Sequence, residues 1–446
     1  MPIRNFVGKL LPSCLRSRTA APLRKRWTRR IEQLEDRTVP SFAEFVDPHP
    51  AAGNQFGAAV VPLSTGNVVV TSPFDDAGGT DAGAVYLFSG ATGALIRTIT
   101  GSIVGDQVGG GGVTALVNGN FVIASPDWSN GGTSSVGAVT WGSGTAGIAG
   151  TVSSANSLVG SSASDQIGSG RVTALTNGNY VVASPLWDNS THADAGAATW
   201  GSGTAGLSGT VSTANSIVGA GPGNNVGGGG VTALTNGNYV VSSPLWDQDL
   251  NHTDLGAVTW ADGATAEHFP VSFQNSLVGH LSGDEVGSGG VTALPNGNYV
   301  VSSPLWDSSS TVADVGAATW GDGTTGVQGP ISLVNNSLVG GHAGDEVGSG
   351  GVTALTNGNY VVSSPLWDNG NAADVGAATW GDGTTGVKGG ISNSNSLLGN
   401  RSGDEASSGG VTALTNGNYV VGSPLWDFSG NSVNVGAATW GDGATG

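Results

Sequence analysis

The chain has 446 residues, of which 78 are glycine and only 10% are charged, and its formal net charge is −18. An acidic surface repels nucleic-acid phosphates and anionic lipids, which argues against nucleic-acid binding. Cys14 is the single cysteine, so the fold uses no disulfide. No apolar run approaches the length of about 18 residues that a transmembrane helix needs.

Residues 1–41 differ in composition from the rest of the chain. Ten of the 14 Lys and Arg residues lie in this segment, together with only three acidic residues. Its apolar patch at 6–11 is too short for an ordinary secretory signal, and the basic run Arg24–Arg30 would also suit a nucleic-acid or nuclear-localisation patch that the acidic body does not support. We predict an export leader, disordered or processed, followed by a repeat domain over 42–446.

The end of the leader carries a recognisable pattern. The stretch Arg29–Phe42, RRIEQLEDRTVPSF, resembles the LE-x-R-x-x-PS segment of large planctomycete surface and secreted proteins, with matching residues at Leu34, Glu35, Arg37, Pro40 and Ser41. The resemblance implies a bacterial protein that is secreted or displayed at the cell surface.

One phrase recurs seven times after the leader, most clearly as VTALTNGNYVVSSPLWD at Val352–Asp368. A regular period of about 60 residues indicates one supersecondary unit that has been copied, each copy burying its apolar face against the next. We number the units repeats 1 to 7, near 54–105, 106–164, 165–223, 224–283, 284–344, 345–403 and 404–446.

Each unit reads as four short strands. V-T-A-L is followed by an Asn-Gly hairpin turn, by a second strand that ends at a proline, by V-G-A-A-T-W and by a fourth strand such as Asn275–Gly279. We predict a type I′ turn, with positive φ at both Asn357 and Gly358. Seven such units predict an all-β fold, a seven-bladed β-propeller of four-stranded repeats.

The seventh unit lacks a fourth strand, and Phe42–Val46 stand in the phase of one. We predict that this N-terminal segment completes the seventh blade and closes the ring, which would leave no open sheet edge. The alternative is that the chain is a fragment of a longer array.

The first unit, Asn54–Gly90, resembles an FG-GAP repeat of integrin-α-type propellers. Phe56-Gly57 open it, Thr71–Pro73 stand at the GAP position, and Gly83–Gly90 match the closing strand. The resemblance implies a seven-bladed propeller with a role in adhesion. The calcium loop D-x-D-x-D-G of that family is replaced in the later repeats by T-N-G-N, so its calcium ligands do not carry over.

Paired tryptophans recur in the repeats. They suit packing between blades, and the alternative is an aromatic ladder that stacks on sugars. The predicted structural aromatics are Trp187, Trp200, Trp246, Trp260, Trp306, Trp320, Trp367, Trp380, Trp426 and Trp440, preceded by the pair Trp128 and Trp141.

Aspartates recur after the first tryptophan of each pair and again before the third strand. Such residues more often form turns with their own backbone, and the alternative is weak calcium binding. No metal or other cofactor is expected, and the weak calcium candidates are Asp188, Asp194, Asp247, Asp254, Asp307, Asp314, Asp368 and Asp374.

Catalytic patterns have little support. G-x-G-x-x-G occurs five times, as at Gly381–Gly386, but no helix follows it, so we interpret it as a turn and not as a dinucleotide site. The six histidines keep no fixed phase and show no metal-ligand spacing, and adjacent carboxylates such as Asp345-Glu346 form a weak dyad.

We therefore expect a non-enzymatic binding or adhesion module with a protein or glycan ligand. The alternatives are a structural component of a surface layer or matrix, which would self-associate, and a propeller enzyme acting on polysaccharide.

Overall fold

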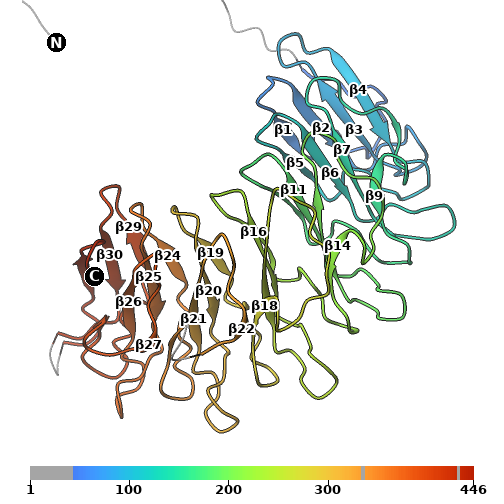
Figure 1. The fold of residues 1–446 in the computed structure, drawn as a ribbon. Coiled ribbons are helices and arrows are strands. Elements are labelled where there is room, and N and C mark those ends of the chain that lie inside the picture. Colours follow the sequence, from blue (N-terminus) through green and yellow to red (C-terminus); the bar gives the residue numbers. More distant parts are fainter. Residues whose placement is uncertain (1–43, 333–336, 429–431) are drawn as a thin grey trace, which may run out of the picture. The chain divides into compact units, whose positions relative to one another are not determined.

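A computed structural model of the chain describes residues 44–446, except 333–336 and 429–431. Phe45–Gly446 form one compact unit, and its described residues are strands, turns and loops without any helix (Figure 1). In that part of the chain no helix could cross a membrane. The leader, with its LE-x-R-x-x-PS stretch and Phe42, lies outside the described residues.

The repeats form seven separate small sheets, so the all-β prediction is confirmed. In repeats 1 to 6 four strands follow one another as an antiparallel meander, and the seventh sheet contains three strands. The first strands are β1 (Val60–Pro62), β5 (Val113–Ala115), β10 (Val172–Ala174), β15 (Gly230–Ala233), β19 (Val291–Ala293), β24 (Val352–Ala354) and β29 (Val411–Ala413). The second strands are β2 (Val68–Ser72), β6 (Phe121–Ser125), β11 (Tyr180–Ser184), β16 (Tyr239–Ser243), β20 (Tyr299–Ser303), β25 (Tyr360–Ser364) and β30 (Tyr419–Ser423).

The third and fourth strands complete each meander, and each second strand ends just before the predicted proline. The third strands are β3 (Ala84–Phe88), β7 (Ala138–Gly142), β12 (Ala197–Gly201), β17 (Ala257–Ala261), β21 (Ala317–Gly321), β26 (Ala377–Gly381) and β31 (Ala437–Gly441). The fourth strands are β4 (Leu95–Thr100), β9 (Ser157–Val159), β14 (Ser216–Val218), β18 (Ser276–Val278), β23 (Ser337–Val339) and β28 (Ser396–Leu398).

A short fifth strand, which the sequence did not predict, links neighbouring repeats. Each of these two-residue strands belongs to one repeat but pairs in parallel with the fourth strand of the repeat before it. The outer edge of the fourth strand thereby gains a hydrogen-bonding partner and is no longer an open sheet edge. They are β8 (Gly150–Thr151), β13 (Gly209–Thr210), β22 (Gly329–Pro330) and β27 (Gly389–Gly390).

The hairpin between the first two strands is not the predicted type I′ turn. In repeat 6 the Gly358 N–H donates to the Leu355 carbonyl, and only Gly358 has a positive φ, of 94°. The Leu355 N–H donates to the Asn359 carbonyl, which leaves three residues in the loop. This is the pattern of a type I turn followed by a left-handed glycine. The Asn-Gly signal therefore located the hairpin correctly but predicted the wrong turn type.

The hydrophobic core lies between consecutive sheets. Each of six clusters combines residues from two neighbouring repeats. Between repeats 4 and 5, for example, Val240 and Val258 pack with Tyr299, Val301 and Trp306. A single repeat buries only part of its apolar side chains by itself, so stability comes from stacking of neighbours.

The predicted closing strand is not formed by its described part. Glu44–Val46 adopt no strand, and the Phe45 ring packs on Phe88 of the first sheet with centroids 4.9 Å apart. The physical reason is a swap specific to repeat 1. In repeat 3 the second strand carries Tyr180 opposite Gly201 on the third strand, whereas repeat 1 has Val68 opposite Phe88. The aromatic ring of this pair is thus on the third strand in repeat 1, where Phe45 packs on it.

Candidate functional site

In repeats 2 to 7 the turn after the third strand receives side chains from the preceding repeat. In repeat 6 the Gly383 carbonyl accepts hydrogen bonds from Asn296 Nδ2 (2.7 Å), Asn298 Nδ2 (2.8 Å) and Trp320 Nε1 (3.0 Å), all in repeat 5. We call this three-donor arrangement the carbonyl latch. The same latch is formed on the carbonyls of Gly203, Gly263, Gly323 and Gly443.

Close backbone approach explains the glycines of the recurring G-x-G-x-x-G pattern. A Cβ atom on Gly383 would lie 1.8 Å from the Gly358 carbonyl oxygen, and one on Gly386 would lie 2.7 Å from the Trp320 Cβ. The pattern occupies the turns between third and fourth strands, as predicted. Gly383 lets the turn approach the hairpin of its own repeat, and Gly386 lets Trp320 of the preceding repeat pack against the turn.

A substitution at the latch glycine tests this explanation. Gly383→Ala is expected to cost about 2 kcal/mol or more, because the clash is with backbone and the turn must move away from its donors. Gly390→Ala is the matched control, since a Cβ there meets nothing within 4 Å. Urea denaturation of both variants gives the comparison, and equal midpoints would contradict the explanation.

The two tryptophans of each pair occupy different places. Those after the proline (Trp128, Trp187, Trp246, Trp306 and Trp367) are buried, with 3–6% of their surface exposed, in the clusters between sheets, and Trp426 is half-buried. The second tryptophans (Trp141, Trp200, Trp260, Trp320 and Trp380) are half-buried and donate through Nε1 to the latch. Trp440 in repeat 7 differs, because 58% of its surface is exposed.

A buried aspartate precedes the first strand of most repeats, a role that sequence reasoning missed. Asp165 Oδ2 accepts the N–H groups of Ser161 and Ser162, at 2.7 and 2.8 Å, and its Oδ1 accepts the N–H of Asp188 at 3.1 Å. Burial raises the pKa of Asp165, and the three N–H donors oppose this effect. The equivalent residues are Asp106, Asn224, Asp284, Asp345 and Asp404.

The eight calcium candidates lie in pairs within loops. The first member of each pair accepts the backbone N–H of the second, as between Asp188 Oδ1 and Asp194 N at 2.9 Å. The second member has a left-handed backbone, with φ of 51° at Asp194, which aspartate tolerates. One carboxylate oxygen of each pair is therefore used to close the loop. The other pairs are Asp247 with Asp254, Asp307 with Asp314, and Asp368 with Asp374.

The structure also brings a histidine to one of these loops, which the sequence did not predict. Within residues 44–446, as far as they are described, His342, Asp345 and Asp368 each offer a ligand atom within 4.8 Å of the other two. In the preceding repeat His280 Nδ1 lies 3.3 Å from Asp284 Oδ2, and this hydrogen bond raises the pKa of His280.

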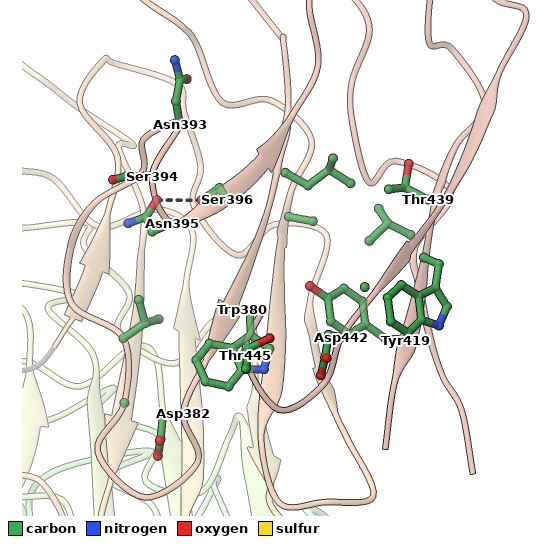
Figure 2. Close-up of a pocket in the computed structure, with 18 residues that line it drawn as sticks. Trp380, Asp382, Asn393, Ser394, Asn395, Ser396, Tyr419, Thr439, Asp442 and Thr445 are labelled. Atoms are coloured by element: carbon green, nitrogen blue, oxygen red, sulfur yellow. Dashed lines mark hydrogen bonds between the residues drawn. The ribbon is translucent and has the colours of Figure 1, made fainter. Parts of the chain in front are cut away.

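A groove of about 660 Å³ lies beside β31 (Figure 2). Trp380, Asp382 and the loop at 393–396 line one side, and Tyr419 and Thr439 line the other. Trp440 also lines the groove. In each earlier repeat a fourth strand pairs with the third at this place. The groove thus has the position of a β-strand, with aromatic, carboxylate and amide groups on its walls.

Comparison with known proteins identifies the repeats. The profile of a family described as a repeat of unknown function (DUF5650) matches residues 62–110, 115–169, 174–228, 233–288, 293–349, 354–408 and 413–446. No curated protein matches the chain. Since the seven matches cover most of the chain, one for each of the seven sheets, the protein belongs to this repeat family.

Proposed function

We propose that the protein is a non-enzymatic binding or adhesion module, exported to the surface of a bacterial cell and built as a closed seven-bladed propeller related to FG-GAP proteins. The FG-GAP-like first repeat and the LE-x-R-x-x-PS stretch support the adhesive role and the export. The ligand in this proposal is a protein or a glycan.

Complementary atoms at the two ends of the array carry the proposal of ring closure. On repeat 7, Asn416 Nδ2, Asn418 Nδ2 and Trp440 Nε1 are the donors of a latch, and they make no hydrogen bond within the described residues. On repeat 1, the exposed Gly90 stands at the latch position, and no described group donates to its carbonyl.

A second pair of groups supports the same junction. In repeats 2 to 6 a first-strand threonine donates to the first strand of the next repeat, as from Thr353 Oγ1 to the Val411 carbonyl at 3.3 Å. Thr412 holds the threonine position in repeat 7, and Val60, 57% exposed, holds the position of Val411 in repeat 1. The exposed ends thus repeat the internal interface on both sides.

Trp440→Ala tests ring closure. In a closed ring Trp440 is an interface residue, so its removal is expected to lower the melting temperature about as much as Trp320→Ala does. Without closure Trp440 is a surface residue, because 58% of it is exposed. Closure is therefore refuted if Trp440→Ala leaves the melting temperature unchanged while Trp320→Ala lowers it.

The second candidate function is a structural layer formed by self-association, because the same two faces could join consecutive chains head to tail. Sedimentation velocity over a hundredfold range of concentration separates the candidates. A concentration-independent monomer favours the module, and growing assemblies favour the layer. Glycan and protein arrays probed with the full chain then test binding, and the absence of any saturable ligand would count against the binding module.

A further inference from the structure

We propose that His342, Asp345 and Asp368 form a binding site for a divalent transition-metal ion of the Zn²⁺ class. These residues come from two loops. His342 at the end of repeat 5 and Asp345 at the start of repeat 6 lie in the loop before β24, and Asp368 follows the buried Trp367 of repeat 6. The proposal does not depend on ring closure or on the adhesive role.

The lone pairs of the carboxylates determine which atoms remain available. Asp345 Oδ2 accepts the N–H groups of Gly341 and His342, at 2.6 and 2.9 Å, and Oδ1 accepts the N–H of Asp368 at 2.9 Å. A carboxylate has about four lone-pair sites, so one remains on Oδ1. Asp368 uses Oδ1 for the N–H of Asp374, at 2.8 Å, and no hydrogen bond to its Oδ2 is found in the described residues.

The histidine is placed to supply the third ligand. His342 Nδ1 lies 3.9 Å from Asp345 Oδ2, too far for a hydrogen bond, and 45% of its side chain is exposed. Within the described residues the imidazole makes no hydrogen bond, so it can turn toward an ion without breaking one. Asp345, in contrast, is fully buried and held by three N–H donors, so it provides a rigid anchor for the site.

The ligand types select the kind of ion. Imidazole nitrogens and carboxylate oxygens are both zinc ligands, and these three groups leave the fourth position of a tetrahedral site to water. Calcium prefers six to eight oxygens, and Mg²⁺ prefers a mostly aqueous octahedron. A site with few ligands, one of them a nitrogen atom, favours Zn²⁺, Co²⁺, Ni²⁺ or Cu²⁺ over Ca²⁺ and Mg²⁺. The acidic chain adds a general attraction for cations.

Other repeats supply the matched comparison. His280, at the end of repeat 4, has similar neighbours in repeat 5, Asp284 and Asp307. Its Nδ1 is within hydrogen-bonding distance of Asp284, however, and its ring centroid lies 5.6 Å from that of Trp306. Between repeats 6 and 7, Arg401 and Asp404 occupy the positions of His342 and Asp345, and the cation of Arg401 disfavours a metal. The site is therefore specific to one repeat.

The test titrates the untagged full chain, carrying Cys14→Ser to remove its thiol, with Zn²⁺ by calorimetry and with Co²⁺ by visible absorption. We expect one ion per chain, d–d bands of four-coordinate Co²⁺, and a melting temperature that rises with metal and falls back with chelator. A hundredfold excess of Ca²⁺ should not displace the ion.

Two substitutions decide the location. His342→Ala and Asp368→Asn are each expected to weaken binding by more than about tenfold, whereas His280→Ala should leave the affinity unchanged. The proposal is overturned by the absence of saturable Zn²⁺ binding, by binding that His342→Ala does not weaken, or by equal losses in the His342 and His280 variants. Displacement by Ca²⁺ would also overturn it, because an all-oxygen site would then be responsible.

Discussion

Asp165→Ala is expected to lower the free energy of unfolding by about 3 kcal/mol or more. The substitution leaves the N–H groups of Ser161, Ser162 and Asp188 without the buried carboxylate that accepts all three. Each buried donor left without a partner costs about 1–3 kcal/mol. Urea denaturation of the full chain measures the loss, and hydrogen exchange of the three amides should accelerate locally.

The chain itself supplies the control for this prediction. In repeat 4 the equivalent position is Asn224, whose Oδ1 accepts the N–H groups of Ala220 and Gly221 and whose Nδ2 donates to the Asp247 carbonyl. Asp165→Asn can adopt that arrangement, so its cost should be much smaller than that of Asp165→Ala. If Asp165→Ala and Asp165→Asn lower the free energy of unfolding equally, the negative charge of Asp165 stabilises the fold, and its hydrogen-bond pattern does not.

Trp306→Ala is expected to lower the free energy of unfolding by a similar amount, about 3–5 kcal/mol, because it opens a cavity in the cluster between repeats 4 and 5. Trp306→Phe should cost much less, since it retains a ring and since Trp306 Nε1 makes no hydrogen bond within the described residues. Phe273→Ala, at a side chain that is 51% exposed, provides the surface control.

Thermal melting of the three variants ranks the losses, and binding of any ligand found on arrays is measured in parallel. A Trp306→Ala protein that keeps its stability but loses its ligand would contradict the packing role. That result would instead favour the aromatic ladder considered as the alternative.

The sequence predicted the repeat, its strands and the position of its hairpin because these depend on local apolar patterns. It predicted the wrong turn type because Asn-Gly fits more than one hairpin loop. Only the hydrogen bond from the Leu355 N–H to the Asn359 carbonyl shows that three residues form the loop. The latch was not predictable, since Asn296 and Gly383 are far apart in sequence and meet only through stacking.

The candidate metal site escaped sequence analysis for a related reason. Asp345 is close to His342 in the chain, and this His-x-x-Asp spacing was the available signal. Asp368 approaches them only because its own N–H donates to Asp345 across the loop. A search for histidines that keep a fixed phase overlooks such a site, because it arises from one repeat and not from the period.

The carbonyl latch has a direction, with donors on one face of a repeat and the acceptor on the other. Any internal unit can consequently follow any other without a change of partner chemistry. A tandem duplication or an in-frame loss of one unit in the gene joins the same donors to the same carbonyl. Length variation by recombination is therefore easily accommodated in such an array, whereas a substitution at one latch glycine affects two units at once.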